Sequence, residues 1–154
     1  MKTIYSIIFA VSMISATVAK PTQEIVPVKL GAKAFKDGDV IKIDEVRSTS
    51  PNLEQGDTVT IKGNYRLESR DAASLQLLLT QIEGNGLEES DKQQLVNISS
   101  GFKPFEVTIT IKHKGYLHLT LYDTKSGKPF GGTYFGTAEQ MDHASGLSVS
   151  HYLK

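Results

Sequence analysis

The 154-residue sequence contains no cysteine and no tryptophan, and its 17 Lys and Arg residues balance 17 Asp and Glu residues. Without cysteine the chain has no disulfide framework, no thiolate metal site, no cysteine nucleophile and no lipid-modified cysteine. Without a basic excess it is not built to hold nucleic acid, because phosphate binding needs clustered Lys and Arg. The P-loop and dinucleotide fingerprints are absent as well. We therefore expect no nucleic-acid partner and no cofactor.

A long apolar run is also missing outside the N-terminus. Lys2 precedes an apolar stretch from Ile4 to Ile14, and Thr17-Val18-Ala19 places small residues at the positions that a signal peptidase reads. These features predict a signal peptide over residues 1–19, cleaved near Ala19-Lys20, and hence a secreted or periplasmic protein. An uncleaved anchor or a buried N-terminal helix is the alternative. The stretch is shorter than the roughly 20 apolar residues of a membrane span, so we expect no span after cleavage.

The remaining chain alternates apolar and polar residues with the period of two that a half-buried strand requires. The strongest runs cover residues 58–67, 105–112 and 116–122. Weaker runs cover Glu24–Leu30, Asp39–Val46, Ser74–Ile82, Gln93–Ser99 and Gly146–Leu153. Lys114-Gly115 predicts a tight hairpin, which would make Val107–Lys112 and Tyr116–Tyr122 antiparallel neighbours.

One short helix is expected over Thr137–Ala144. Thr137 is a favourable N-cap residue, and Gln140 follows three residues later, which completes a capping box.

About seven or eight short strands, separated by turns every eight to twelve residues, predict an all-β fold. We expect an antiparallel β-sandwich, with a partly closed β-barrel as the alternative. Gly-Asp turns that lead into Thr-rich strands resemble the architecture of secreted Ig-like or fibronectin-like modules, although the Cys…Trp…Cys core of Ig domains is absent. Residues 20–36 are expected to form an N-terminal tether or an edge strand, and residues 37–154 a single β-sandwich domain.

Aromatic side chains gather in the last third of the sequence and supply the candidate ligand site. Three residues share the polar side of one predicted strand, and three more lie in a glycine-rich segment: Tyr116, His118 and Tyr122, then Phe130, Tyr134 and Phe135. Rings on a solvated face indicate an interaction surface, and neighbouring glycines let the backbone bend toward a ligand. These six residues either form a platform for a carbohydrate or a protein partner, or pack inside the fold beneath the C-terminal segment.

No catalytic pattern accompanies the aromatic residues. Asp142, His143 and Ser145 stand too close together on the predicted helix to face one another as a triad. The sequence also lacks the Gly-x-Ser-x-Gly elbow. Asn97-Ile98-Ser99 is an N-glycosylation sequon, but it falls in a predicted strand.

Four histidines are the remaining candidates for metal binding: His113, His118, His143 and His151. Their spacing does not match the local pairs typical of metal sites, although Met141 and His143 offer a weak pair for copper.

The sequence thus favours an exported, non-catalytic module that binds a carbohydrate or a protein partner, at the cell envelope or outside the cell. One alternative is a structural accessory protein that pairs through its edge strands by β-augmentation. The other is a small His-dependent metal-binding protein.

Overall fold

The computed structural model describes residues 21–36, 38–82, 88–90 and 94–149. The predicted signal peptide and His151 lie outside these residues. Within the described segments, no helix combines the length and the apolar character that crossing a membrane would need.

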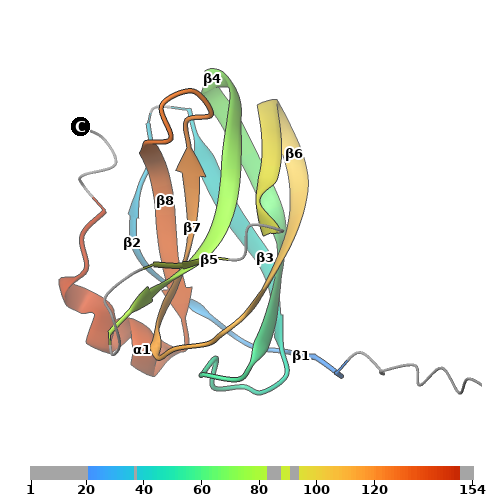
Figure 1. Cartoon of the computed structure of the whole chain (residues 1–154), viewed down its shortest axis with the longest axis vertical. Helices are drawn as coiled ribbons and strands as arrows, with labels where there is room; N and C mark the ends of the chain where they lie inside the picture. The colour runs from blue at the N-terminus through green and yellow to red at the C-terminus, as the bar shows by residue number, and fades with distance from the viewer. Residues whose placement is uncertain (1–20, 37, 83–87, 91–93, 150–154) are drawn as a thin grey trace, which may run out of the picture.

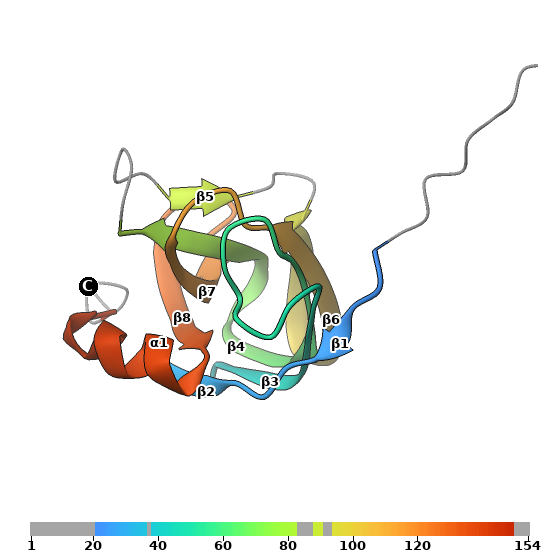
Figure 2. The same ribbon diagram turned by 90° about the horizontal axis from the view of Figure 1, so that it is seen from below.

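The described chain is mostly β and antiparallel, as predicted (Figure 1). Its strands are β1 (Glu24–Ile25), β2 (Lys29–Ala34), β3 (Val40–Ser48), β4 (Thr58–Gln81), β5 (Glu88–Ser90), β6 (Val96–Thr110), β7 (Gly115–Tyr122) and β8 (Pro129–Gly136). They are followed by a short helix, α1 (Ala138–His143), and a 3-10 turn, η2 (Ala144–Gly146). The strands form one sheet in the order β1-β3-β4-β7-β8-β2, and β5 and β6 also pair with β4. This sheet curls into a half-barrel, seen end-on in Figure 2.

Strand β4 is the spine of the curled sheet. Its first part pairs with β3 and β6. Its last part, Ser74–Gln81, pairs with β7 and, at Ser74 and Leu75, also with β6. A register shift between Leu67 and Ala72 lies between the two parts, and alternate residues on both sides of it, such as Ile61 and Leu77, face the core. The two predicted strands 58–67 and 74–82 are therefore one bent strand.

Strand β6 follows this bend. The backbone N–H of Thr108 donates a hydrogen bond of 3.0 Å to Oε1 of Gln94, which lies 14 residues earlier. An extended strand of that length would span roughly 45 Å. The chain from Gln94 to Thr108 must therefore fold back on itself, which brings the two halves of the β4–β6 ribbon toward each other.

The N-terminal segment supplies the two end strands of the sheet order, β1 and β2. β1 pairs with β3, whereas β2 pairs with β8. Between them, the N–H of Val26 donates to the carbonyl of Val46 at 2.9 Å. The residues expected to form either a tether or an edge strand thus contain two short strands, and they link β3 to β8.

Two apolar clusters hold these elements together. The larger fills the inside of the curled sheet, with fully buried side chains such as Leu75 and Leu119. The smaller, here called the outer cluster, consists of Tyr134, Met141, Ala144 and Val149. It lies outside the sheet, where α1 and the segment after it cover β8 and β2. Met141 of α1 enters this cluster because two glycines leave room for it. A Cβ atom on Gly31 would lie 2.7 Å from Sδ of Met141, and one on Gly136 would lie 3.1 Å from its Cε.

The predicted helix is confirmed together with its capping box. Oγ1 of Thr137 accepts a hydrogen bond of 3.2 Å from the N–H of Gln140. In return, Oε1 of Gln140 accepts one of 2.9 Å from the N–H of Thr137.

The predicted hairpin at Lys114-Gly115 is wrong. β6 pairs with β4, and β7 pairs with the last part of β4 and with β8 rather than with β6. The short connection after Ile111 carries the chain from one part of the curled sheet to another. Glycine is required at position 115 because of a close approach, since a Cβ atom there would lie 2.3 Å from the carbonyl oxygen of Thr80.

The predicted strand 146–153 is also wrong over its described part. Residues 144–146 form η2, and residues 147–149 have no regular secondary structure. Leu147 and Val149 alternate with polar residues because both contact the outer cluster around Tyr134. Residues 150–153 lie outside the described segments.

Candidate functional site

Four of the six predicted site residues lie in the interior. His118, Phe130, Tyr134 and Phe135 are each no more than 6% exposed. Phe130 and Phe135 belong to the main core, and Tyr134 belongs to the outer cluster. The His118 ring lies against that of Tyr134, with 4.7 Å between ring centroids, and its Nδ1 is 2.8 Å from Oγ1 of Thr120. These side chains therefore pack against other parts of the fold.

The other two, Tyr116 and Tyr122, are partly exposed and lie at the two ends of β7. They are six positions apart on the strand, which corresponds to roughly 20 Å. Each tyrosine lines a different hollow. The structure thus does not bring the two tyrosines together at one surface.

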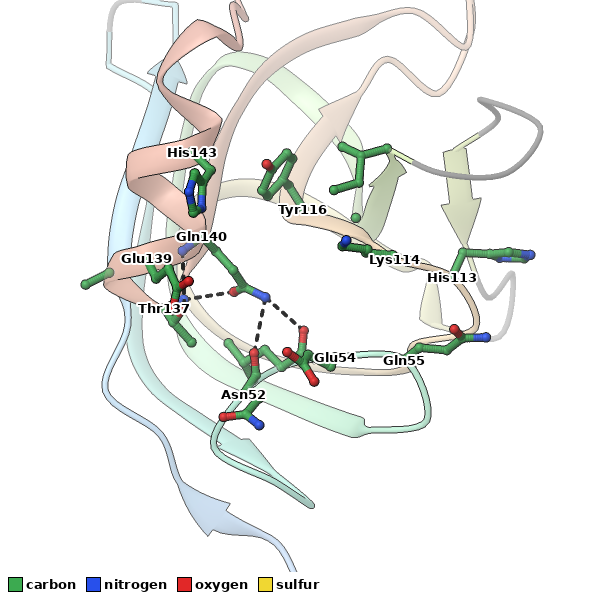
Figure 3. Close-up of a pocket in the computed structure, with 14 residues that line it drawn as sticks. Asn52, Glu54, Gln55, His113, Lys114, Tyr116, Thr137, Glu139, Gln140 and His143 are labelled. Carbon is green, nitrogen blue, oxygen red and sulfur yellow. Dashed lines mark hydrogen bonds between the residues drawn. The ribbon is translucent and has the colours of Figure 1, made fainter.

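The larger hollow, here called the end cleft, has a volume of about 920 Å³. Three segments far apart in the sequence form its walls (Figure 3): the loop between β3 and β4, the connection from β6 to β7, and α1 with its N-cap. Its lining residues are Asn52, Leu53, Glu54, Gln55, Ile82, His113, Lys114, Gly115, Tyr116, Thr137, Ala138, Glu139, Gln140 and His143. Figure 3 shows Tyr116 between α1 and the β6–β7 connection, with Asn52 and Glu54 on the opposite side.

Gln140 joins two walls of the end cleft. Its Nε2 donates hydrogen bonds of 3.1 Å to the carbonyl oxygens of Asn52 and Leu53, while its Oε1 accepts from the N-cap of α1. One side chain therefore begins the helix and also fixes the helix against the loop.

The loop is further held by the buried carboxylate of Asp57. It accepts hydrogen bonds from the hydroxyls of Thr49, at 3.0 Å, and Ser50, at 2.6 Å, and from the N–H of Glu54, at 2.8 Å. Burial alone would raise the pKa of Asp57, but the hydrogen bonds from Ser50, Glu54 and Thr49 outweigh it and lower the pKa below its ordinary value. The loop is thus organised around an ionised carboxylate.

Leu53 adds a strained position in the middle of this loop. Its φ of 55° lies in the left-handed region, although the residue is not glycine. Its side chain is only 2% exposed and belongs to the main core. Burial of the leucine side chain and the bond from Gln140 thus hold a backbone conformation that an isolated chain would avoid.

The end cleft combines one aromatic ring with several polar groups. A partly exposed aromatic ring, Tyr116, stands among amide, carboxylate, ammonium and imidazole groups. Among the described residues that line the cleft, none is serine or cysteine, and the hydroxyl of Thr137 is engaged in the cap of α1. Near the cleft, the carboxylate of Asp142 bonds to Nζ of Lys29 at 2.6 Å, and this bond lowers the pKa of Asp142.

In the described part of the chain, no three His, Cys, Asp or Glu side chains gather as a metal site would require. The weak pair of Met141 and His143 is split, because Met141 is buried in the outer cluster whereas His143 lines the end cleft.

Sequence reasoning identified Tyr116 but missed the loop that faces it. Asn52, Glu54 and Gln55 are ordinary turn residues in the sequence, and nothing local places them beside α1. In the sequence, Gln140 shows only its capping role. Its second hydrogen-bonding partner lies 87 residues away and leaves no local pattern.

Comparisons of the chain with protein-family models, curated proteins and solved structures found no match. The function must therefore be argued from the chemistry of the residues.

Proposed function

We propose that this protein is an exported, non-catalytic module that binds a carbohydrate in the end cleft. The observation that carries the proposal is the position of Tyr116, partly exposed inside a hollow of about 920 Å³ among polar side chains. A sugar ring offers an apolar C–H face to an aromatic side chain and a rim of hydroxyls to amides and carboxylates. Ligand sites typically combine such an aromatic wall with a few polar groups.

The rigidity of the cleft walls supports binding without rearrangement. Gln140 fixes α1 to the loop, and Asp57 holds the loop through three hydrogen bonds. A site ordered before the ligand arrives loses less conformational entropy on binding, and its affinity rises accordingly.

The architecture that we propose is the partly closed barrel rather than two separate sheets. β4 runs through both parts of the curled sheet without interruption, and the N-terminal segment pairs with β3 and β8. Ligands commonly bind at an end of a small barrel, and the end cleft is lined by the β3–β4 loop, the β6–β7 connection and α1.

Export is supported by the sequence features of residues 1–19 alone. Expression of the full chain with a C-terminal tag, followed by N-terminal sequencing of protein recovered outside the cytoplasm, tests this part. A first residue of Lys20 is expected. Protein retained in the cytoplasm with Met1 intact would refute export.

A protein partner bound by β-augmentation is the second candidate. Phe102 of β6 is 62% exposed and supports it. Pro104 weighs against it, because proline on a strand that pairs with β4 on one side removes an N–H that an added strand would need. Light scattering of the purified protein, alone and with candidate neighbours, tests this alternative.

The carbohydrate proposal is tested with a microarray of neutral and acidic oligosaccharides, followed by calorimetric titration of those that bind. Tyr116→Ala should weaken binding at least tenfold, because a sugar ring stacked on the tyrosine loses that contact. Phe102→Ala removes an exposed ring far from the cleft and is the matched control. Equal affinities of the wild type and Tyr116→Ala, or no binding to any saccharide, would exclude the end cleft as a carbohydrate site.

A further inference from the structure

The second hollow, here called the outer hollow, lies at the other end of β7 and has a volume of about 460 Å³. Side chains from β4, β6 and β7 and from the turn after β7 line it. One of its lining residues is Tyr122, the partly exposed predicted site residue that does not line the end cleft.

The strand register places three of the lining residues in one row. Ser74 of β4 is the direct partner of Asn97 on one side and of Tyr122 on the other. Directly paired residues on neighbouring strands point to the same face of a sheet. An amide, a hydroxyl and an aromatic ring therefore stand side by side across three strands, over about 10 Å.

The outer hollow offers hydrogen bonds without net charge. Among the described residues that line it, Asp123 is the one with a charged side chain. Its carboxylate already bonds to the guanidinium of Arg70, and it accepts from the N–H groups of Lys125, at 3.0 Å, and Ser126, at 2.7 Å. This leaves the hydroxyl and amide groups of Ser74, Gln76 and Asn97 to face a ligand.

The hollow also has an apolar side. Leu95 is 38% exposed and lines it together with Tyr122. A leucine and a tyrosine beside neutral amides match a ligand that has both C–H faces and hydroxyls. An ion gains little here, because the one carboxylate is neutralised by Arg70.

We propose that the row Asn97–Ser74–Tyr122 is a second binding site, specific for a neutral oligosaccharide. The inference extends the proposed carbohydrate-binding function, but it uses none of the residues of the end cleft. Tyr116 and Tyr122 lie roughly 20 Å apart on β7, and the strand between them is covered, since His118 and Thr120 are buried. The two sites are therefore separate, and one molecule can hold two saccharide chains.

The test counts the sites. The full chain is produced in a bacterial host, so that Asn97 carries no N-linked glycan. Hexasaccharides of glucose, mannose, xylose and galactose are titrated by calorimetry, with hexasaccharides of galacturonic acid and hyaluronan as acidic comparisons. We expect two sites for a neutral hexasaccharide in the wild type and one in Tyr122→Ala, with the affinity of the remaining site unchanged.

Asn97→Ala is the second variant. Its side chain is exposed, so folding should be unaffected, and loss of the amide's hydrogen bonds should weaken the outer site at least tenfold. Phe102→Ala is the control and should retain both sites.

Each result distinguishes the two proposals. A single wild-type site that is lost only in Tyr116→Ala overturns the outer hollow and leaves the end cleft standing. A single wild-type site that is lost only in Tyr122→Ala overturns the end cleft and leaves the outer hollow standing. Two sites that persist in Tyr122→Ala and in Asn97→Ala overturn the outer hollow. Absence of binding to every hexasaccharide overturns both.

Discussion

Nε2 of Gln140 lies 3.1 Å from the carbonyl oxygen of Leu53, and this contact joins helix α1 to a loop 87 residues earlier in the chain. The same side chain completes the capping box of the helix through its Oε1. The start of α1 and the position of the loop are therefore coupled through one amide group. The two functions of that amide can be separated by substitution.

Gln140→Glu should destabilise the protein while leaving the helix cap intact. Glutamate accepts at the third helical position as well as glutamine does, but it has no N–H to donate to the carbonyls of Asn52 and Leu53. The loss of these bonds should lower the free energy of unfolding by about 1–3 kcal/mol, measured by urea denaturation at neutral pH. The control is Glu139→Gln, at an exposed position on the same turn, which makes the opposite charge change. It should change the free energy of unfolding by less than about 0.5 kcal/mol. Similar stabilities for both variants would contradict the coupling.

At Leu53, the glycine variant should be more stable than the alanine variant, which is the opposite of the usual order at a buried position. Leu53→Ala removes buried side-chain volume, which should lower the free energy of unfolding by about 2–5 kcal/mol. It also keeps a Cβ atom on a residue in the left-handed conformation, so the backbone strain remains. Leu53→Gly loses slightly more burial but relieves roughly 1–2 kcal/mol of backbone strain. The glycine variant should therefore be the more stable one in urea denaturation. Leu67 is fully buried and has no positive φ, so the alanine variant should be the more stable one at that position. The same order at both positions would show that Leu53 is unstrained.

The carboxylate of Asp57 should make stability depend on pH. Because its pKa is lowered in the folded protein, ionised Asp57 stabilises the fold at and above the pH at which the unfolded carboxyl ionises, about pH 4. This contribution is lost as the pH falls through the lower pKa of the folded state. Asp57→Asn should therefore be less stable than the wild type at pH 7, by about 1–2 kcal/mol, and the difference should narrow by pH 2. Asp71 is exposed, and Asp71→Asn should follow the wild-type curve. A constant difference between Asp57→Asn and the wild type across this range would contradict the prediction.

Gly115→Ala should destabilise the β6–β7 connection. A Cβ atom there would meet the carbonyl oxygen of Thr80 at 2.3 Å and Cδ2 of Leu79 at 2.5 Å, so the strand must shift. Overpacking of this kind lowers stability by about 1–3 kcal/mol. Gly146→Ala is the control, because a Cβ atom at that position meets nothing within 4 Å. Thermal denaturation distinguishes them, and equal melting temperatures would show that the connection can relax.

Local patterns in the sequence were sufficient for the helix and for most strands. Thr137 and Gln140 predict the start of α1 because a capping box is formed by residues three apart. Alternation likewise predicts β3, β7 and both parts of β4. The partners of these strands could not be predicted in the same way, since pairing depends on contacts across the fold. Lys114-Gly115 has the chemistry of a hairpin, yet β7 pairs with β4 and β8.

The candidate site was accessible from the sequence only in part. Aromatic residues at Tyr116 and Tyr122 were identified because they stand on the polar side of an alternating strand. The same reasoning could not place His118, on the same face, beneath the cluster of Tyr134 and Met141. Neither could it place Asn97 beside Tyr122, because that juxtaposition passes through Ser74 on a third strand.

The pairing of Thr58 with Thr110 joins residues 52 positions apart, with 3.1 Å between their hydroxyl oxygens. Chains whose contacts join such distant residues fold slowly, because each pairing must wait for a long loop to close. For the exported protein that we propose, slow folding is an advantage during synthesis. The central strand cannot complete its pairing with β6 until the segment around Thr110 has been made, so the complete fold cannot form before most of the chain has been synthesised.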